Sequence, residues 1–355
     1  MTSLTCRIRR TAAVAVALAA GSALALTGTA SAQPGQSSGK ASGSTVESAP
    51  LVKGLYQSAY SERNNVLWAT SAVGRPPVIN SSLLKVDPRT LKVKNSYTPP
   101  VTNAETGAVE AVYGIAVDDE HNTVWTTNTR DNSVAVYDQR TGKHLASLPG
   151  VNHAREVVVD TRHNTAWASS FGDGTVVAFD TRTFKEKKRV TVEGSTPAGL
   201  AVNERTGAAY AADLGGDRII EITPKGESPR LIPTGDGPIS VALSKDGRTA
   251  YTADQAAGGL SVVDLKKGTV KKSVPTGAGA LSVATDRRSG KVLVANRTPG
   301  TVTVVDPAKG AVVETLATGT NPNHIQVAGG TAFVVDKSGT GPEGQDQAHR
   351  IRIGR

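Results

Sequence analysis

A repeat of about forty-two residues runs through this chain from near residue 50 to its end, and it leaves few folds open. Its clearest element is a short run of alternating apolar residues that ends in a polar turn, the pattern of a β-strand. Seven copies are present: LLKVDPRT (Leu83 to Thr90), VAVYDQRTG (Val134 to Gly142), VVAFDTRT (Val176 to Thr183), IIEITPKG (Ile219 to Gly226), LSVVDLKKG (Leu260 to Gly268), VTVVDPAKG (Val302 to Gly310) and IRIG (Ile351 to Gly354). We name this element strand C.

Each unit has three more strands. Strand B begins at Val66, Val124, Ala166, Ala209, Ala250, Leu293 and Ala332, and strand A precedes it, as in GIAVD (Gly114) and GLAVN (Gly199). Strand D follows strand C, as in KRVTV (Lys188). One strand B position holds a large apolar residue, which we interpret as core between neighbouring sheets; it reads Trp68, Trp125, Trp167, Tyr210, Tyr251, Leu293 and Phe333.

Four-stranded units at this spacing predict an all-β fold, a single seven-bladed β-propeller, because each sheet buries both faces only against its neighbours. The last unit stops after strand C. An apolar segment, Ala49 to Lys53, precedes strand A of the first unit and is unpaired within it. We therefore expect this N-terminal segment to supply strand D of the last blade and to close the ring, which removes two open sheet edges.

The segment before the repeat has the pattern of a signal peptide over residues 1–32. Arg7, Arg9 and Arg10 precede an Ala-rich apolar run, and Ala30-Ser31-Ala32 forms a small-residue cleavage site. Residues 33–48 are rich in Gly and Ser, which predicts a flexible linker before a propeller at 49–355. We expect a secreted or extracytoplasmic protein with no transmembrane segment after cleavage. The residues after Arg9-Arg10 do not complete a twin-arginine signal, so the general secretory route is preferred.

Cleavage near Ala32 changes the chemistry available to the mature chain. It removes the single Cys and the single Met, so thiolate catalysis and disulfides are excluded. It also removes three of the 40 Lys and Arg residues. The remaining 37 cationic residues and the 31 Asp and Glu residues give a net charge of +6. A charge of this size favours weak attraction to anions without identifying one.

Candidate site residues are those that depart from the repeat at the start of strand A, where the blades meet the central channel. One column reads Gln57, Gly114, Glu156, Gly199, Ser240, Ser282 and His324, and the column before it reads Tyr56, Tyr113, Arg155, Ala198, Ile239, Leu281 and Asn323. Blades one, two, three and seven thus place aromatic and polar side chains around one channel mouth. Solvated channel filler is the simpler interpretation, and a polar ligand site with two stacking tyrosines is the functional one.

The loops between strands B and C point to the same mouth. Those of blade one (Ala72 to Ser81) and blade seven (Lys337 to Ala348) are longer than the others, and these blades become neighbours when the ring closes. Arg130 and Arg297 also fall in such loops. A cationic, partly aromatic mouth is suited to an anionic ligand.

The sequence resembles the bacterial YncE-like propellers of the YVTN-repeat family from about Leu51 to the C-terminus. The resemblance rests on KGLYQSAYS (Lys53 to Ser61), REVVVD (Arg155 to Asp160), PNHIQV (Pro322 to Val327) and HRIRIG (His349 to Gly354). It implies an exported binding propeller, with single-stranded DNA as one ligand class, and it supplies no catalytic residues. The strand ends AYAAD, AYTAD and AFVVD depart from the repeat signature.

Two functions from different classes follow. The first is a non-catalytic, monomeric binding propeller for an anionic or polymeric ligand such as single-stranded nucleic acid, with a protein partner also open. Its predicted ligand-binding residues are Tyr56, Gln57, Tyr113, Arg130, Arg155, Glu156, Arg297, Asn323 and His324. The alternative is a lactonase- or lyase-like hydrolytic propeller with Glu156 and His324 as acid and base, assisted by Arg155 and His153. Neither requires a cofactor or a metal.

Overall fold

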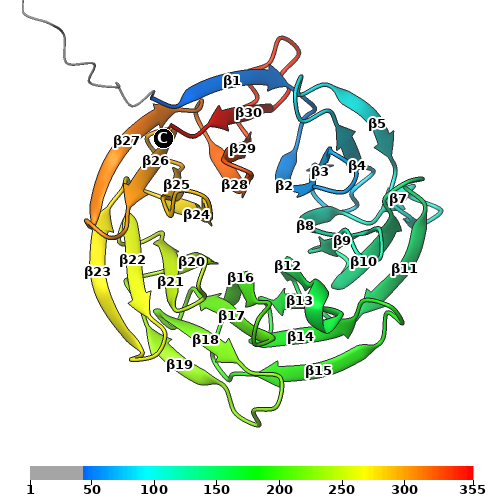
Figure 1. Ribbon diagram of the computed structural model, residues 1–355. Helices are drawn as coiled ribbons and strands as arrows, with labels where there is room; N and C mark the ends of the chain where they lie inside the picture. The colour runs from blue at the N-terminus through cyan, green and yellow to red at the C-terminus, as the bar shows by residue number, and fades with distance from the viewer. Residues whose placement is uncertain (1–42, 355) are drawn as a thin grey trace, which may run out of the picture. The chain divides into compact units, whose positions relative to one another are not determined.

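The computed structural model describes residues 43–354, which form seven four-stranded antiparallel sheets arranged in a ring (Figure 1). The predicted seven-bladed β-propeller is confirmed. The innermost strands, strand A of each blade, are β2 (Leu55–Ser61), β8 (Val112–Asp118), β12 (Ala154–Asp160), β16 (Pro197–Asn203), β20 (Pro238–Leu243), β24 (Ala280–Thr285) and β28 (Pro322–Ala328). The predicted signal peptide, residues 1–32, lies outside the described residues.

The other strands follow outward in each blade. Strands B are β3 (Val66–Val73), β9 (Thr123–Asn128), β13 (Thr165–Ser170), β17 (Ala208–Asp213), β21 (Thr249–Asp254), β25 (Val292–Asn296) and β29 (Thr331–Asp336). Strands C are β4 (Asn80–Val86), β10 (Ser133–Asp138), β14 (Thr175–Asp180), β18 (Arg218–Ile222), β22 (Gly259–Asp264), β26 (Thr301–Asp306) and β30 (Gln347–Arg352). Strands D are β5 (Val93–Tyr97), β11 (His144–Pro149), β15 (Glu186–Thr191), β19 (Arg230–Pro233), β23 (Thr269–Pro275), β27 (Ala311–Ala317) and β1 (Thr45–Pro50).

Burial follows the position of each strand in its blade. Strands β9, β13 and β17 are buried at every residue, whereas the outer strand β11 is exposed at every second residue. The strand B aromatics fill the space between blades, as the sequence indicates: Trp68 is fully buried and packs against Ile115 and Tyr137 of the next blade. Because each sheet uses both faces in this way, the core is a ring of inter-blade layers.

The N-terminal strand closes the ring. Strand β1 pairs with β30 from Thr45 opposite Arg352 to Pro50 opposite Gln347, and Figure 1 shows the two strands side by side. Ser48 Oγ lies 2.7 Å from His349 Nδ1, and Arg350 forms an ion pair with Glu47. The strand therefore begins inside the stretch predicted as linker (33–48). An outer strand needs only backbone hydrogen bonds, so its polar sequence gives no apolar signal.

Removing β1 is expected to open the ring. We predict that a protein starting at residue 51 unfolds at lower denaturant concentration than one starting at residue 44. The free energy of unfolding should fall by on the order of 3 kcal/mol, because a few backbone hydrogen bonds worth ~1 kcal/mol each are lost. The edge of β30 then also becomes free to pair with other chains. Chemical denaturation and light scattering measure both effects. Equal stability and equal solubility of the two proteins would show that closure contributes nothing.

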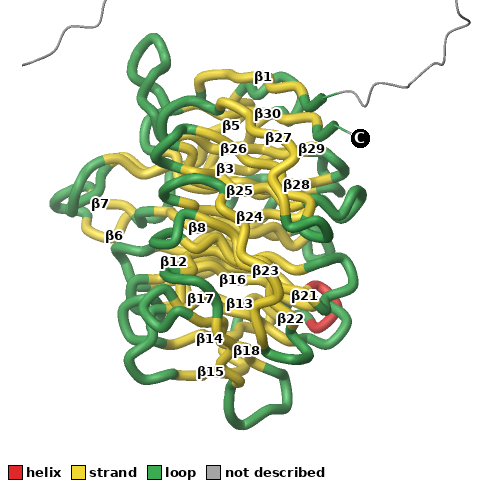
Figure 2. Tube along the Cα trace, turned by 90° about the vertical axis from the view of Figure 1, so that its left-hand side faces the viewer, coloured by secondary structure: helices red, strands yellow, loops and turns green. Residues whose placement is uncertain are grey.

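Two smaller elements interrupt the repeat. A hairpin of β6 (Val101–Asn103) and β7 (Ala108–Val109) stands between β5 and β8 and protrudes from one side of the ring (Figure 2). A 3-10 turn, η1 (Thr161–His163), joins β12 and β13. Within residues 43–354, no helix has the length and apolarity needed to cross a bilayer.

Candidate functional site

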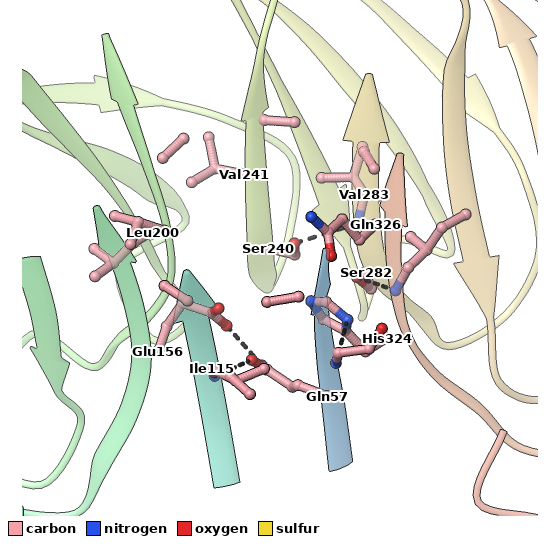
Figure 3. Close-up of a pocket in the computed structure, with 18 of the residues that line it drawn as sticks. Gln57, Ile115, Glu156, Leu200, Ser240, Val241, Ser282, Val283, His324 and Gln326 are labelled. Atoms are coloured by element: carbon pink, nitrogen blue, oxygen red, sulfur yellow. Dashed lines mark hydrogen bonds between the residues drawn. The ribbon is translucent and has the colours of Figure 1, made fainter. Parts of the chain in front are cut away.

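The central channel contains a cavity of about 890 Å³ that is lined by residues of all seven inner strands. It extends from the end where the A strands begin, marked by Arg297 and Lys337, to the opposite end, marked by Arg287. Its volume lies in the range of small-molecule sites. Figure 3 shows side chains from several blades directed into this space.

A ring of polar side chains lies at one level of the channel. It is the predicted column of Gln57, Glu156, Ser240, Ser282 and His324, all of which line the cavity, with Gly114 and Gly199 at the remaining two positions. Glycine is required at Gly114, because a Cβ there would lie 2.5 Å from the backbone oxygen of Arg155. The missing side chain lets Gln57 of blade one reach past blade two to Glu156 of blade three (Figure 3).

Most of these polar side chains join one blade to the next. Gln57 Oε1 accepts a hydrogen bond from the backbone N–H of Ile115, and His324 Nδ1 accepts one from that of Ser58. The two serines accept an equivalent hydrogen bond from the inner strand of the next blade. Ser240 Oγ accepts from the backbone N–H of Val283, and Ser282 Oγ accepts from that of Ile325. A structural role therefore accounts for part of the column.

Glu156 departs from this pattern. Its carboxylate accepts a hydrogen bond from Gln57 Nε2, at 2.8 Å, and from no backbone N–H among the described residues. Burial raises the pKa of Glu156 to about 7, and the Gln57 hydrogen bond and the charge of Arg155 offset only part of that effect. A carboxyl group that titrates near neutrality inside a channel can both accept and return a proton.

His324 lies across the channel from Glu156, because blades seven and three are three steps apart in a seven-membered ring. Burial lowers the pKa of His324 to about 4, so the ring is neutral at pH 7. Since Nδ1 accepts the Ser58 N–H at 3.3 Å, the proton of the neutral ring resides on Nε2. Nε2–H is thus a hydrogen-bond donor without a partner among the described residues.

The mouth beside this ring is a stack of aromatic and cationic groups. The ring centroids of Tyr56 and Tyr113 are 4.5 Å apart, and Lys337 Nζ lies 3.4 Å from the centroid of Tyr56. On the other side, Arg155 Cζ lies 5.8 Å from the centroid of Tyr113 and 5.3 Å from that of Phe171. Such cation–π contacts hold the cations in place without neutralising them.

These cations have no carboxylate partner. Within residues 43–354, neither Arg155, Arg297 nor Lys337 forms an ion pair. Arg297 instead donates to Asn323 Oδ1 at 2.6 Å, and Asn323 donates to the backbone oxygen of Tyr56. Burial lowers the pKa of Lys337 to about 8, with Asp346 opposing and Arg297 adding to the shift. The mouth is therefore a cationic site open to an anion.

The structure places most of the predicted site residues together. Those that line the channel cavity are Tyr56, Gln57, Tyr113, Arg155, Glu156, Arg297, Asn323 and His324. Arg130 and His153 do not line it; they face a separate cavity of about 120 Å³, between blades one, two and three, that also touches Tyr56 and Tyr113. His153 immediately precedes β12 in a left-handed turn, with φ of 50°, and its ring centroid lies 5.6 Å from that of Phe171.

Lys337 was missed as an individual residue, although it begins a loop singled out for its length. The signal was a third column, four residues after the large apolar residue of strand B, which reads Ala72, Thr129, Phe171, Leu214, Gln255, Arg297 and Lys337. Phe171 and Lys337 belong to it and contact the stack at the mouth. In the described part of the chain, no three His, Cys, Asp or Glu side chains are grouped so that they could hold a metal ion.

Comparison with solved structures shows the same architecture in enzymes. Virginiamycin B lyase from Staphylococcus aureus superposes with a TM-score of 0.71 at 12% identity, covering 87% of this chain and 99% of that chain. A streptogramin B lyase gives 0.70 at 13% identity, covering 87% and 97%. Hydrazine synthase of Kuenenia stuttgartiensis gives 0.66 at 15% identity, covering 81% and 93%. No protein-family model and no curated protein sequence matches the chain.

These likenesses establish the class, a seven-bladed β-propeller. At such identities they show the fold alone. They also correct the main functional prediction. The sequence favoured a non-catalytic propeller that binds an anionic polymer such as single-stranded DNA, but two of these neighbours are lyases, and we do not retain that prediction.

Proposed function

We propose that this propeller is a lyase- or lactonase-type enzyme that opens a C–O bond of an anionic ester or lactone in the central channel. The observation that carries the proposal is Glu156, a carboxyl group with a pKa of about 7 that faces the N–H of a neutral histidine across the cavity. The environment raises the pKa of Glu156 and lowers that of His324, so the carboxyl group can accept a proton near neutral pH while the histidine stays neutral and donates a hydrogen bond.

The chemistry divides between the two walls. In an elimination, the Glu156 carboxylate removes a proton from the carbon next to the one that bears the ester oxygen, the C–H electrons form a double bond, and the C–O bond breaks toward oxygen. His324 Nε2–H donates a hydrogen bond to that oxygen as its charge develops. In a hydrolysis, the same carboxylate takes a proton from water, whose oxygen adds to the carbonyl carbon; the tetrahedral adduct then expels the alcohol oxygen, which takes the proton back from Glu156. Arg155 and Lys337 bind the anionic group of the substrate at the mouth.

The products distinguish the two reactions. Elimination gives a ring-opened isomer with no new oxygen, whereas hydrolysis incorporates one oxygen from solvent. Reaction in ¹⁸O-labelled water followed by mass spectrometry therefore assigns the class. We favour elimination, because the two neighbours named above are lyases.

Two finer assignments belong to the proposal. The matches at Lys53 to Ser61 and His349 to Gly354 support a relation to the YncE-like propellers. The signal-peptide pattern of residues 1–32 supports action outside the cytoplasm. Secretion of a reporter fused to residues 1–32 tests the second of these.

Turnover of a panel of lactones and of streptogramin B by the purified protein tests the function. His324→Ala is expected to lower kcat by about 10²-fold, the effect of losing one donor to a developing oxyanion. His324→Gln, whose amide can accept from Ser58 and donate into the channel, is expected to recover part of that loss. Absence of turnover across the panel, or full activity of His324→Ala, would contradict the proposal.

A further inference from the structure

We propose that the substrate is an amphiphile, with an anionic group held at the cationic mouth and an unbranched apolar chain that extends down the channel past Glu156. This inference rests on the proposed function, since it places the reacting bond at the level of the polar ring. It adds a substrate class and an orientation that acid–base chemistry alone does not supply.

The channel changes character immediately below the polar ring. The next residue along six of the seven inner strands is a large aliphatic side chain that borders the cavity and packs between blades, each at most 6% exposed: Ile115, Val157, Leu200, Val241, Val283 and Ile325. Ser58 occupies the seventh position. Leu200, Val241 and Val283 lie close to the polar ring in Figure 3. A carboxylate placed among them would lose its hydration without gaining a partner.

The apolar lining continues for two more residues. The following column is mostly alanine, and the column after that is mostly valine, with Tyr60, Thr285 and Gln326 as the polar exceptions; all of these line the same cavity. Charge returns only at Arg287, at the far end. Three residues of strand span roughly 10 Å. The channel therefore forms a tube of that length whose wall side chains are mostly apolar and come mainly from the last two columns, with a charged group at each end.

The mouth selects the orientation. Arg155, Arg297 and Lys337 stand on blades three, six and seven, while the strand starts of blades four to six contribute a cluster of Ala198, Ile239 and Leu281 with Phe171 and Leu214 packed against it. One side of the mouth is thus cationic and the other apolar. An anionic head and an apolar chain match both sides, and transfer of the chain from water into the tube is favourable.

Binding of straight-chain carboxylates, from acetate to octanoate, measured by calorimetry tests this orientation without requiring turnover. Affinity is expected to rise about three- to fourfold per methylene group until the tube is filled. The corresponding alcohols are expected to bind far more weakly than the carboxylates, because they lack the negative charge that the cations of the mouth attract. A wild-type protein whose affinity is independent of chain length, or that binds octanol as well as octanoate, would overturn the inference.

Matched variants separate the two parts of the site. Val159→Thr and Val202→Thr, which put hydroxyl groups on half-buried side chains of the channel wall, should flatten the dependence on chain length. Leu231→Asn, at an exposed residue of the outer strand β19, is the control and should leave that dependence unchanged. Both substitutions preserve side-chain volume, and either variant tests the inference by itself if the other fails to fold. Unchanged chain-length dependence in both folded channel variants would overturn the inference.

The results also separate this inference from the proposed function. Chain-length-dependent binding without turnover of any lactone or ester would retain the amphiphile site and reject the enzyme. Turnover with no preference for longer chains, together with flat binding, would retain the enzyme and reject the amphiphile.

Discussion

Glu156→Gln is expected to lower kcat/KM by about 10²- to 10⁴-fold, the usual contribution of a positioned acid–base group. The amide keeps the shape of the side chain and can still bond Gln57, but it cannot accept a proton. The measurement is steady-state turnover on whichever panel member the wild-type protein opens. Activity of Glu156→Gln within tenfold of wild type would remove Glu156 from the mechanism.

The pH profile provides a second readout of the same residue. A carboxylate base is active when ionised, so kcat/KM should rise with pH through about 7, the pKa of Glu156. It should fall again above about 8 as Lys337 loses its proton and its attraction for the anion. Lys337→Arg, which stays charged, should retain the acid limb and lose the alkaline one. An acid limb near the ordinary glutamate value would contradict the assignment.

Stability supplies the control for Glu156→Gln. The pKa of Glu156 in the folded protein, about 7, lies above the ordinary value of 4.5, so folding favours the protonated form. That stabilisation is present at low pH and is lost as pH rises through 7. Above pH 7 the wild-type carboxylate is ionised in a desolvated place and the amide is not. The inactive variant should therefore be at least as stable as wild type at pH 8, which excludes misfolding as the cause of its inactivity.

The fold could be predicted from the sequence because the same pattern of strands and turns occurs in seven copies. Turns and alternation fix the strands, and the unpaired last unit requires a closing strand. The start of that strand could not be read in the same way. Thr45 to Ser48 lie on the outside of the ring and contribute only backbone pairing, polar contacts and an ion pair, so their composition is that of a linker.

The site was predictable where the strand register determines side-chain position. Gln57, Glu156 and His324 fall in one column of the repeat, and the structure places them in one ring of the channel. Residues in loops and turns do not inherit this register. Arg130 and His153 were placed at the same mouth from the sequence, yet they face a neighbouring cavity, because the left-handed turn at His153 directs its ring toward Phe171.

Chemical role was less predictable than position. The sequence shows that Glu156 is the single acidic residue of its column, but a burial-induced pKa near 7 depends on the surrounding blades. The assignment of His324 as a donor depends equally on a contact from blade one, the Ser58 N–H. Both properties come from neighbours that are distant in the sequence, and the Ser58–His324 contact exists only because the ring brings blade seven against blade one.

Trp68→Ala is expected to destabilise the protein by about 3–5 kcal/mol, the range for removing a large buried aromatic side chain. Trp68 is fully buried and packs between blades one and two. Its Nε1 donates a hydrogen bond to Gln139 Oε1 at 3.2 Å. The substitution leaves a cavity and removes one hydrogen-bond partner of the buried Gln139 side chain. Urea denaturation measures the change, and Trp68→Phe, which keeps most of the apolar volume, should cost less than Trp68→Ala.

The same interface carries the contact from Gln57 to Glu156, which crosses blade two at Gly114. Loosening blade one against blade two should therefore also weaken the hydrogen bond that opposes the raised pKa of Glu156. We expect the acid limb of the pH profile of Trp68→Ala to move upward, in a protein that remains folded at low denaturant. A loss of stability below about 1 kcal/mol, a surface-like value, would show that this aromatic column does not hold the blades together.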